Sequence, residues 1–386
     1  MTRRAPLIYL VACEPSADAL GAQLMEALRV ETEGRARFMG IGGARMTAAG
    51  LQSLFDPREL VLLGIFEVVP AYRRVLARVR EAIDDITARN PDLLVTIDSW
   101  GFTGRIHERL AKAGNLIPRV RYVAPQVWAW RPGRAKQLSR WINHLLTLFP
   151  FEPPYFTPHG LATTWVGHPV VESASGRGDA GAFRMRHQIA PEATILSVLP
   201  GSRPGEVKRL LPVFRRTVEL LAKQHSGLTT VIPTVGTVAE LVRDGTSDWP
   251  CPLVIVNETE VYDAFAASRA ALAASGTVSL ELAMASVPHV IAYRVSALSA
   301  FVFRRLRKTR FANLVNVLLD RLAVPELLQE DCNPKSLAAA ISQILLPGTV
   351  AETQRADFKE ALAKLVPPDG SPSRLAARTV LKLIRV

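Results

Sequence analysis

Residues 195–210 of this chain have the sequence ILSVLPGSRPGEVKRL. The apolar run Ile195–Leu199 predicts a buried β-strand. Val207 and Leu210 recur at helical spacing, so a helix is expected to begin just after the glycine-containing turn. A buried strand that passes through a short turn into a helix is the repeating unit of a parallel, doubly wound sheet. This stretch therefore predicts an α/β fold.

The same alternation of apolar runs and amphipathic stretches recurs along the chain. In the first half, strands are expected at Leu7–Ala12, Arg37–Ile41, Leu93–Ile97, Arg121–Ala124 and Leu145–Phe149. In the second half, they are expected at Ile195–Leu199, Thr229–Ile232, Leu253–Val256, Ala270–Ala274 and His289–Ala292. We predict two Rossmann-like domains that face each other across a cleft, because such sheets bind ligands at the carboxyl ends of their strands.

The domain boundaries follow from composition. The polar stretch Glu172–Ala182 contains almost nothing to bury and is typical of a linker. We predict an N-terminal domain over residues 1–172 and a C-terminal domain over residues 183–345. Residues 346–386 are expected to form helices that pack back on the N-terminal domain.

The composition restricts the class of protein. The 386 residues are 48% apolar and 21% charged, which excludes disorder, collagen-like repeats and coiled coil. The net charge of +12 indicates an anionic partner, but no nucleic-acid-binding module is recognisable. Cys13, Cys251 and Cys332 are isolated, which favours a reducing compartment. The cysteines thus predict a cytoplasmic protein. The apolar segment Leu7–Ala12 is too short for a signal peptide or a membrane span, so any membrane contact is expected to be peripheral.

Two turns in the second half suit a phosphate-containing ligand. Gly201 and Ser202 let backbone N–H groups approach a phosphate at a helix start, and Arg203 adds a bidentate donor. Ser275, Gly276 and Thr277 follow another strand in the same way, and Glu281 is placed to accept hydrogen bonds from sugar hydroxyls. The alternatives are an ordinary strand-to-helix turn and a capped helix with a solvated glutamate. The two turns together favour a nucleotide.

Polar residues also follow the strands of the first half. Asp98 ends the apolar strand Leu93–Ile97 and is a candidate general base, the alternative being a loop or capping residue. Glu14, Ser16 and Asp18 follow the first strand, and Gly42 and Gly43 follow the second. These glycines lack the spacing of a dinucleotide fingerprint, but they leave room for close approach of a ligand.

An aromatic segment and the histidines give weaker indications. Tyr122–Arg131 contains Trp128 and Trp130, two of the six tryptophans, and either core packing or ligand contact explains such a pair. His168 lies at a strand end and is a candidate for ligand contact. The other six histidines show no metal-ligand spacing, so no metal site is expected.

Together these segments resemble the lipid-A-disaccharide synthase family. The resemblance runs in order through Val11–Asp18, Gly40–Met46, Leu63–Val68, Ile97–Ser99, Tyr122–Arg131, Phe149–Glu152, Gly167–Pro169, Leu199–Glu206, Ser275–Glu281, and from Asn316 through Pro325–Gln329. It implies a GT-B fold and an inverting transfer of diacylglucosamine from UDP-2,3-diacylglucosamine to the 6-hydroxyl of 2,3-diacylglucosamine 1-phosphate. The implied products are a β-1′,6-linked disaccharide and UDP.

The resemblance also implies roles for individual residues. Asp98 would be the base that takes the acceptor proton, and Arg203 would stabilise the leaving diphosphate. The residues expected to bind the UDP-sugar are Gly201, Ser202, Arg203, Glu206, Ser275, Gly276, Thr277, Glu281, Asn316 and Gln329. The residues expected to bind the acceptor are Glu14, Ser16, Asp18, Gly42, Gly43, Trp128 and Trp130. No cofactor or metal is implied.

The chain departs from the family pattern in several places. Cys13 and Ala17 replace glycines, Trp100-Gly101 replaces Pro-Asp, Ala124 and Gln126 replace serines, and Val315 replaces a proline. Because these changes are concentrated in the first half, three alternatives remain: a paralogue with a different acceptor, another UDP-sugar enzyme such as an epimerase, and an inactive UDP-sugar-binding protein.

A basic and apolar stretch indicates contact with an anionic membrane. Ala297–Phe311 interleaves phenylalanines with five arginine or lysine residues, which predicts peripheral docking on the inner face of the bacterial inner membrane. The alternative is a solvated basic helix with its apolar side in the core. The sequence leaves a homodimer open.

Overall fold

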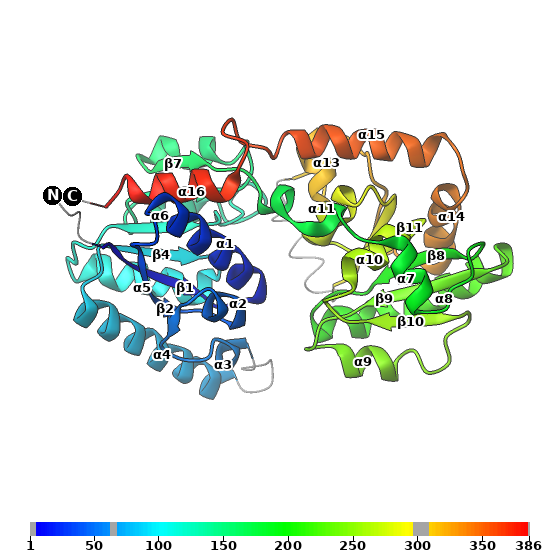
Figure 1. The fold of residues 1–386 in the computed structure, drawn as a ribbon, viewed down its shortest axis with the longest axis horizontal. Helices are drawn as coiled ribbons and strands as arrows, with labels where there is room; N and C mark the ends of the chain where they lie inside the picture. Colours follow the sequence, from blue (N-terminus) through cyan, green and yellow to red (C-terminus); the bar gives the residue numbers. More distant parts are fainter. Residues whose placement is uncertain (1–4, 62–67, 296–308, 385–386) are drawn as a thin grey trace. The chain divides into compact units, whose positions relative to one another are not determined.

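The computed structural model describes residues 5–61, 68–295 and 309–384. The expected docking stretch Ala297–Phe311 lies outside the described residues, apart from its last three positions. The chain divides into two compact units, Met1–Pro169 with Leu365–Val386 and Val170–Lys364. Each unit contains one parallel sheet with helices (Figure 1). The predicted α/β fold of two Rossmann-like domains is confirmed.

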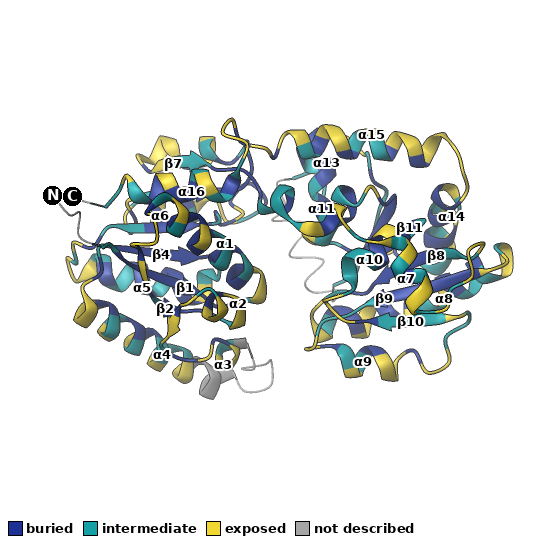
Figure 2. Cartoon of the chain, viewed as in Figure 1, coloured by how far each residue is buried: buried dark blue, intermediate teal, exposed yellow. Residues whose placement is uncertain are grey.

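The sheet of the first unit has seven parallel strands. Their order is β3-β2-β1-β4-β5-β6-β7, with bounds Gln52–Ser53, Arg37–Ile41, Leu7–Ala12, Leu93–Ile97, Arg119–Tyr122, His144–Thr147 and Ala162–Trp165. The helices of this unit are α1 (Pro15–Glu31), α2 (Ala44–Ala48), α3 (Arg58–Val61), α4 (Val68–Arg89), α5 (Trp100–Lys112), α6 (Gly133–Leu138) and α16 (Pro372–Leu381). Every residue of β1 and β4 is buried, because both faces of a parallel sheet are covered by helices (Figure 2).

The sheet of the second unit has six parallel strands. Their order is β10-β9-β8-β11-β12-β13, with bounds Leu253–Val256, Leu228–Pro233, Thr194–Leu199, Ala270–Ala274, His289–Tyr293 and Glu326–Leu328. The helices are α7 (Ala180–Arg186), α8 (Pro204–Gln224), α9 (Ala239–Asp244), α10 (Val261–Ala267), α11 (Val278–Met284), α13 (Leu314–Leu319), α14 (Pro334–Leu345) and α15 (Thr349–Ala363). Helices α8 and α14 pack together, and their apolar sides share one core with β8 and β11.

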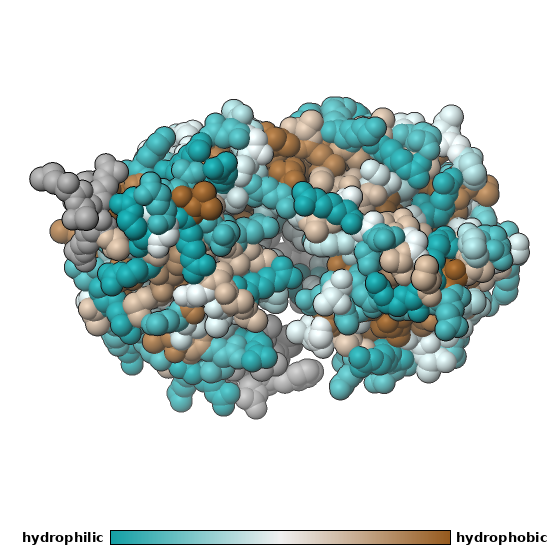
Figure 3. All heavy atoms as spheres, viewed as in Figure 1, coloured by the Kyte–Doolittle hydropathy of each residue, from teal (hydrophilic) through white to brown (hydrophobic). Residues whose placement is uncertain are grey.

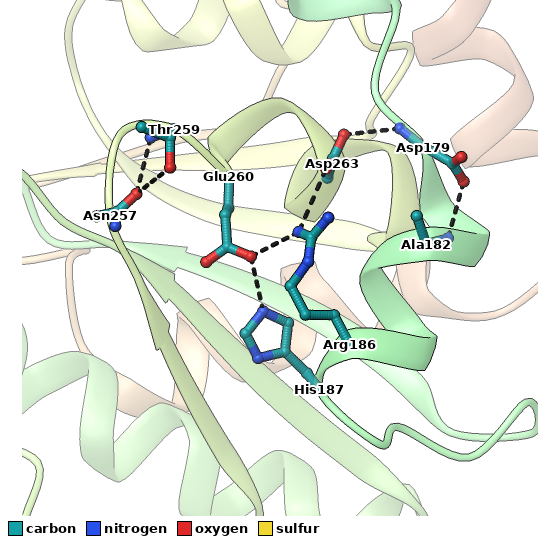
Figure 4. Close-up of polar contacts among 8 residues, drawn as sticks. All are labelled: Asp179, Ala182, Arg186, His187, Asn257, Thr259, Glu260 and Asp263. Carbon is teal, nitrogen blue, oxygen red and sulfur yellow. Dashed lines mark hydrogen bonds and ion pairs between the residues drawn. The ribbon is translucent and has the colours of Figure 1, made fainter.

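Residues expected to form a linker are folded into the second unit. The short 3-10 helix η4 (Ala174–Gly176) and α7 pack against α10. Arg186 Nη1 lies 2.6 Å from Glu260 Oε1 and 3.5 Å from Asp263 Oδ2, and His187 Nε2 lies 3.2 Å from the same glutamate oxygen (Figure 4). These side chains point toward one another from α7 and from the start of α10, and they fix α7 on the unit.

The last two helices divide between the units, whereas the sequence placed both on the N-terminal domain. Helix α15 packs on α11, α13 and α14, where Phe358 stacks on His289 with ring centroids 5.0 Å apart. Helix α16 packs on α1 in the first unit, and Arg378 Nε lies 3.1 Å from Glu31 Oε1. Apolar residues on one side of each helix decide where it packs.

Hydrophilic residues predominate on the face drawn in Figure 3, which fits the charged composition. Among the described residues, no helix combines the length and the apolar character needed to cross a membrane.

Candidate active site

The carboxyl ends of three neighbouring strands bring the polar residues of the first unit together. Ala12 of β1 pairs with Ile97 of β4, and Ile97 pairs with Tyr122 of β5. The residues that directly follow these three strands therefore lie side by side at one edge of the sheet. Asp98 is anchored there, because its N–H donates to the Tyr122 carbonyl at 3.0 Å.

Asp98 faces a buried arginine that sequence reasoning missed. Arg121 is 1% exposed, and its Nη2 lies 3.9 Å from Asp98 Oδ1. Arg121 also donates to the Val123 carbonyl at 3.0 Å and to Thr103 Oγ1 at 2.8 Å, so its orientation is fixed. The Asp98 side chain remains 46% exposed. The carboxylate is thus oriented on one side and open to a ligand on the other.

Burial changes the pKa of Arg121 but leaves it cationic. Loss of solvent lowers its pKa to about 10, while the charge of Asp98 raises it and the charge of Arg134 lowers it. Arg121 is therefore still protonated at neutral pH. Strand β5 has the sequence RVRY, in which Arg121 stands between Val120 and Tyr122, and a buried charge in a parallel sheet is retained only with partners.

Glu14 joins the same edge. Ser99 Oγ donates to Glu14 Oε1 at 3.2 Å, which links the end of β4 to the end of β1. The preceding residue, Cys13, is buried, and burial, followed by the charges of Glu14 and Asp98, raises the pKa of its thiol to about 12. The Cys13 thiol is therefore neutral at physiological pH.

The backbone is strained at this edge. Asp98, Ser99, Val123 and Arg131 have φ values of 53°, 48°, 76° and 51°. A positive φ is uncommon outside glycine and is least favourable for a β-branched residue such as valine. Four of the ten described non-glycine residues with positive φ lie between residues 98 and 131. Such strain persists where surrounding structure enforces it, and it is concentrated at functional sites.

Asp18 is held by the protein rather than free for a ligand. Its carboxylate accepts hydrogen bonds from the N–H groups of Gly43 at 2.8 Å, Arg45 at 2.9 Å and Met46 at 3.1 Å. We therefore revise its role from acceptor contact to support of the Gly42-Gly43 turn. A Cβ at Gly42 would come within 2.6 Å of the Leu51 side chain, so packing requires this glycine. Ser16 lies exposed in the first turn of α1.

The two tryptophans of the aromatic segment have different environments. Trp128 is buried, contacts the Phe151 ring edge-on, and donates from Nε1 to Glu152 Oε1 at 3.3 Å. Burial raises the pKa of Glu152 to about 7, although hydrogen bonds from the backbone of Phe149 and from Trp128 lower it. Trp130 is half-buried, with the guanidinium of Arg131 4.4 Å from its ring centroid. Trp128 is therefore a core residue, and Trp130 is accessible.

In the second unit, the predicted phosphate turn lies at the end of β8. Gly201 has φ 109°, and a Cβ there would come within 2.6 Å of the Glu206 carboxylate. Arg203 begins the 21-residue helix α8 as its N-cap, and its side chain is 73% exposed. Its Nη1 lies 3.1 Å from Glu206 Oε1, so the buried glutamate orients the exposed guanidinium. This arrangement suits an anion at the start of α8.

The second turn lies at the end of β11, the direct neighbour of β8. Gly276 and Thr277 are exposed, and the space around a Cβ at Gly276 is open. Ser275 Oγ donates to the Ala312 carbonyl at 3.2 Å, which fixes the strand end. Glu281 follows in the next turn, within α11. The structure therefore brings both predicted turns to one edge of the sheet.

Asn316 has a structural environment. It is fully buried, its Nδ2 donates to Val324 O and to Glu326 Oε1 at 2.8 Å each, and its Oδ1 accepts from the N–H groups of Ala323 at 2.9 Å and Val324 at 2.8 Å. Both donors and both acceptor sites of the amide are used. We therefore revise its role from UDP-sugar contact to support of the segment that leads into β13.

Gln329 lies at the end of β13 beside two residues that sequence reasoning missed. Its N–H donates to the Tyr293 carbonyl at 2.9 Å, its carbonyl accepts from Arg294 Nε at 3.2 Å, and its φ is 51°. Burial, followed by the charge of Glu206, raises the pKa of Tyr293. Tyr293 and Arg294 thus extend the site from β11 across β12 to β13.

No group of three or more histidine, cysteine or acidic side chains is placed to hold a metal ion within the described ranges. His168 is buried, and burial lowers its pKa to about 3. The ring centroids of Phe149 and His168 lie 5.3 Å apart. The neutral ring of His168 is thus part of the core around Phe149.

Comparison with known proteins gives a family and a fold. A sequence profile of the family described as lipid-A-disaccharide synthetase matches residues 8–374. Lipid-A-disaccharide synthase of Rhodospirillum centenum is 50% identical over 379 residues, covering 98% of this chain and 94% of the relative. The Gluconobacter oxydans enzyme of the same name is 44% identical over 385 residues, covering 100% and 92%.

Solved structures with low identity share the fold. UDP-GlcNAc 2-epimerase from Neisseria meningitidis bound to UDP-GlcNAc is similar with a TM-score of 0.62 and 11% identity, covering 97% of this chain and 99% of that one. CalG4, the calicheamicin glycosyltransferase, is similar with a TM-score of 0.59 and 16% identity, covering 100% of both chains. The architecture is therefore that of GT-B glycosyltransferases.

Proposed function

We propose substrates and residue roles from one premise: the chain belongs to the lipid-A-disaccharide synthase family and is a hexosyltransferase. The donor is UDP-2,3-diacylglucosamine, and the acceptor is 2,3-diacylglucosamine 1-phosphate. The first unit binds the acceptor, and the second binds the UDP-sugar. The products are the β-1′,6-linked tetraacyl disaccharide 1-phosphate and UDP.

Asp98 is the general base in this proposal. Its carboxylate takes the proton from the acceptor 6-hydroxyl as that oxygen attacks the anomeric carbon of the donor. The bond from this carbon to the diphosphate breaks on the opposite face, which inverts the configuration. The observation that carries the proposal is the half-exposed Asp98 carboxylate, 3.9 Å from the fixed cation of Arg121. Arg121 positions the base from the protein side.

The leaving diphosphate is stabilised by the turn at β8. The N–H groups around Gly201 and Ser202, the start of α8 and the Arg203 guanidinium favour negative charge there. Glu206 orients Arg203, as the 3.1 Å ion pair supports. Ser275, Gly276 and Thr277 contact the nucleotide, Glu281 accepts from sugar hydroxyls, and Gln329 completes the pocket. No metal or cofactor takes part in this scheme.

The decisive experiment measures the product. Purified protein is incubated with both substrates, and the disaccharide is detected by mass spectrometry. Asp98→Asn is expected to lower turnover by about 100-fold or more while UDP affinity stays unchanged, as for a lost general base. Asp84→Asn, an exposed change on α4, is the matched control. Near-normal turnover of Asp98→Asn would assign the base elsewhere, with Glu14 the next candidate.

The same assay separates the alternatives. UDP binding without any disaccharide indicates a paralogue with a different acceptor or an inactive binding protein. Conversion of the UDP-sugar without an acceptor indicates an epimerase.

We further propose that the protein acts at the inner face of the bacterial inner membrane. Both proposed substrates carry acyl chains, and transferring them to water exposes a large apolar surface. Each basic residue near an anionic leaflet contributes about 1 kcal/mol, and salt weakens the attraction. Changing Arg304, Arg305 and Arg307 to Gln is expected to reduce sedimentation with anionic vesicles without changing UDP binding. Undiminished sedimentation would exclude this stretch as the docking element.

A further inference from the structure

A small cavity in the first unit is lined by two arginines and a tryptophan. Its volume is about 310 Å³, and Trp100, Arg131, Gly133, Arg134 and Gln137 line it. These residues come from the start of α5 and from the segment around α6. The three polar side chains at its wall are those of Arg131, Arg134 and Gln137.

Aromatic rings hold the arginines in place. The Arg134 guanidinium lies 4.8 Å from the Trp100 ring centroid and 5.1 Å from that of Trp130. The Arg131 guanidinium lies 4.4 Å from the same Trp130 ring. Stacking restricts where a guanidinium lies while leaving its N–H donors in the ring plane free to bind an oxyanion.

The two cations have no acidic partner in the described parts of the chain. Neither Arg131 nor Arg134 has a carboxylate within 4.0 Å among these residues. Partial burial, followed by the charge of Arg131, lowers the pKa of Arg134. Two like charges held together at a cavity repel each other, and a bound dianion removes that repulsion.

The cavity adjoins the candidate base through one side chain. The guanidinium of Arg121, the partner of Asp98, lies 5.4 Å from the Trp100 ring centroid. Trp100 therefore contacts both the arginine beside the base and the arginine of the cavity. A sugar whose hydroxyl reaches Asp98 would have a phosphate receptor within the same unit.

We propose that this cavity binds a phosphate monoester and, in the reaction, holds the 1-phosphate of the acceptor. The inference rests on the proposed function for the identity of the ligand. Arg134 and Arg131 supply charge-assisted hydrogen bonds to the phosphate oxygens. Gln137 adds an uncharged donor at the rim. The cavity then makes the phosphate a determinant of acceptor specificity.

A kinetic comparison tests the role in catalysis. Arg134→Gln is expected to raise KM for the phosphorylated acceptor by about 10- to 100-fold, the range for a lost charged hydrogen bond. KM for the UDP-sugar should stay unchanged. With an acceptor that lacks the 1-phosphate, wild type and variant should have equal kinetics. Arg140→Gln, an exposed change just beyond α6, is the matched control and should leave all constants unchanged.

A binding measurement without turnover tests the site itself. Glucose 1-phosphate and inorganic phosphate are titrated while tryptophan fluorescence is followed, because Trp100 lines the cavity. Saturable changes should occur in wild type and in Arg140→Gln, and should be lost in Arg134→Gln and weakened in Arg134→Lys. Tighter binding of the sugar phosphate than of inorganic phosphate identifies the ester as the ligand. Equal binding identifies a free-phosphate site and overturns the acceptor assignment.

The outcomes separate the two proposals. If Arg134→Gln changes KM equally for the phosphorylated and the unphosphorylated acceptor, the cavity does not bind the 1-phosphate. If Arg134→Gln instead raises KM for the UDP-sugar alone, the cavity binds the donor diphosphate and the inference is overturned. If wild type forms no disaccharide but binds the sugar phosphate through Arg134, the proposed function fails and the phosphate site stands. An equal melting temperature of the variants shows that each of them is folded.

Discussion

Replacing Asn316 by alanine tests whether this residue supports the fold or contacts the ligand. The change removes four hydrogen bonds, two donated and two accepted, within the segment that leads into β13. Each contributes about 1 kcal/mol net, and buried groups left without a partner cost at least as much. Asn316→Ala should therefore lower the free energy of unfolding by about 4 kcal/mol.

The effect reaches the site only indirectly. The Glu326 carboxylate also accepts from the N–H groups of Ala312 and Asn313 at 2.8 Å, and Ala312 O accepts from Ser275. Loss of Asn316 thus loosens one anchor of this network while the others remain. We expect UDP affinity of the folded variant to fall by less than about fivefold, which corresponds to about 1 kcal/mol.

Urea unfolding and UDP titration at a temperature where the variant is folded measure the two quantities. Asn257→Ala is the control, because Asn257 is exposed and its side chain accepts only local hydrogen bonds from Thr259. That control should lose no more than about 1 kcal/mol. Unchanged stability of Asn316→Ala together with a large loss of UDP affinity would refute the reasoning and return Asn316 to the ligand site.

Two further predictions concern charge. Arg203→Lys keeps the positive charge but loses the bidentate fork, so kcat/KM should fall by about tenfold or more, and equal kinetics would mean that diffuse charge suffices. His168 and His289 have pKa values of about 3 and 4 because both are buried, so the folded state binds fewer protons than the unfolded state and stability falls as pH drops below 6.5. Each buried histidine lowers the free energy of unfolding by about 2 kcal/mol at pH 5. Glu152, with its pKa raised to about 7, increases that free energy by about 2 kcal/mol between pH 7 and pH 5. Urea unfolding should therefore show a net loss between pH 7 and pH 5 that is larger in Glu152→Gln, and a flat profile would contradict the neutral burial of these histidines.

Strands were predictable where their physical signal is local. The runs Leu7–Ala12, Leu93–Ile97 and Ala270–Ala274 have the predicted bounds, because buried parallel strands are continuous apolar segments between turns. The sequence reasoning missed β3, β7 and β13. Strand β7, for example, has the sequence ATTW, and its pairing with β6 at the sheet edge, which the sequence does not reveal, makes it a strand.

The sequence predicted where the site residues lie, but it did not predict which groups they contact. The end of a parallel strand predicted where Asp98 and Gly201 lie, since the carboxyl ends of strands meet at one edge. The same reasoning could not separate Glu14 from Asp18. Glu14 accepts a hydrogen bond from Ser99, just after the neighbouring strand β4, whereas Asp18 accepts one from the backbone of α2. Hydrogen bonds to residues distant in sequence decide that difference. Arg121 was missed because its partners, Thr103 and Asp98, precede it by 18 and 23 positions.

Trp100 gives the departures from the family pattern a different meaning. The sequence placed acceptor binding in doubt because Trp100-Gly101 stands where the family has Pro-Asp. In the structure, Trp100 lies against the guanidiniums of both Arg121 and Arg134, and it also packs on Trp141 at 5.8 Å. Trp100 also lines the cavity together with Arg131 and Arg134, so the substitution places an aromatic ring beside these two charges. An aromatic ring that holds the Arg134 guanidinium at the cavity suits an anionic acceptor, which argues against a loss of acceptor binding.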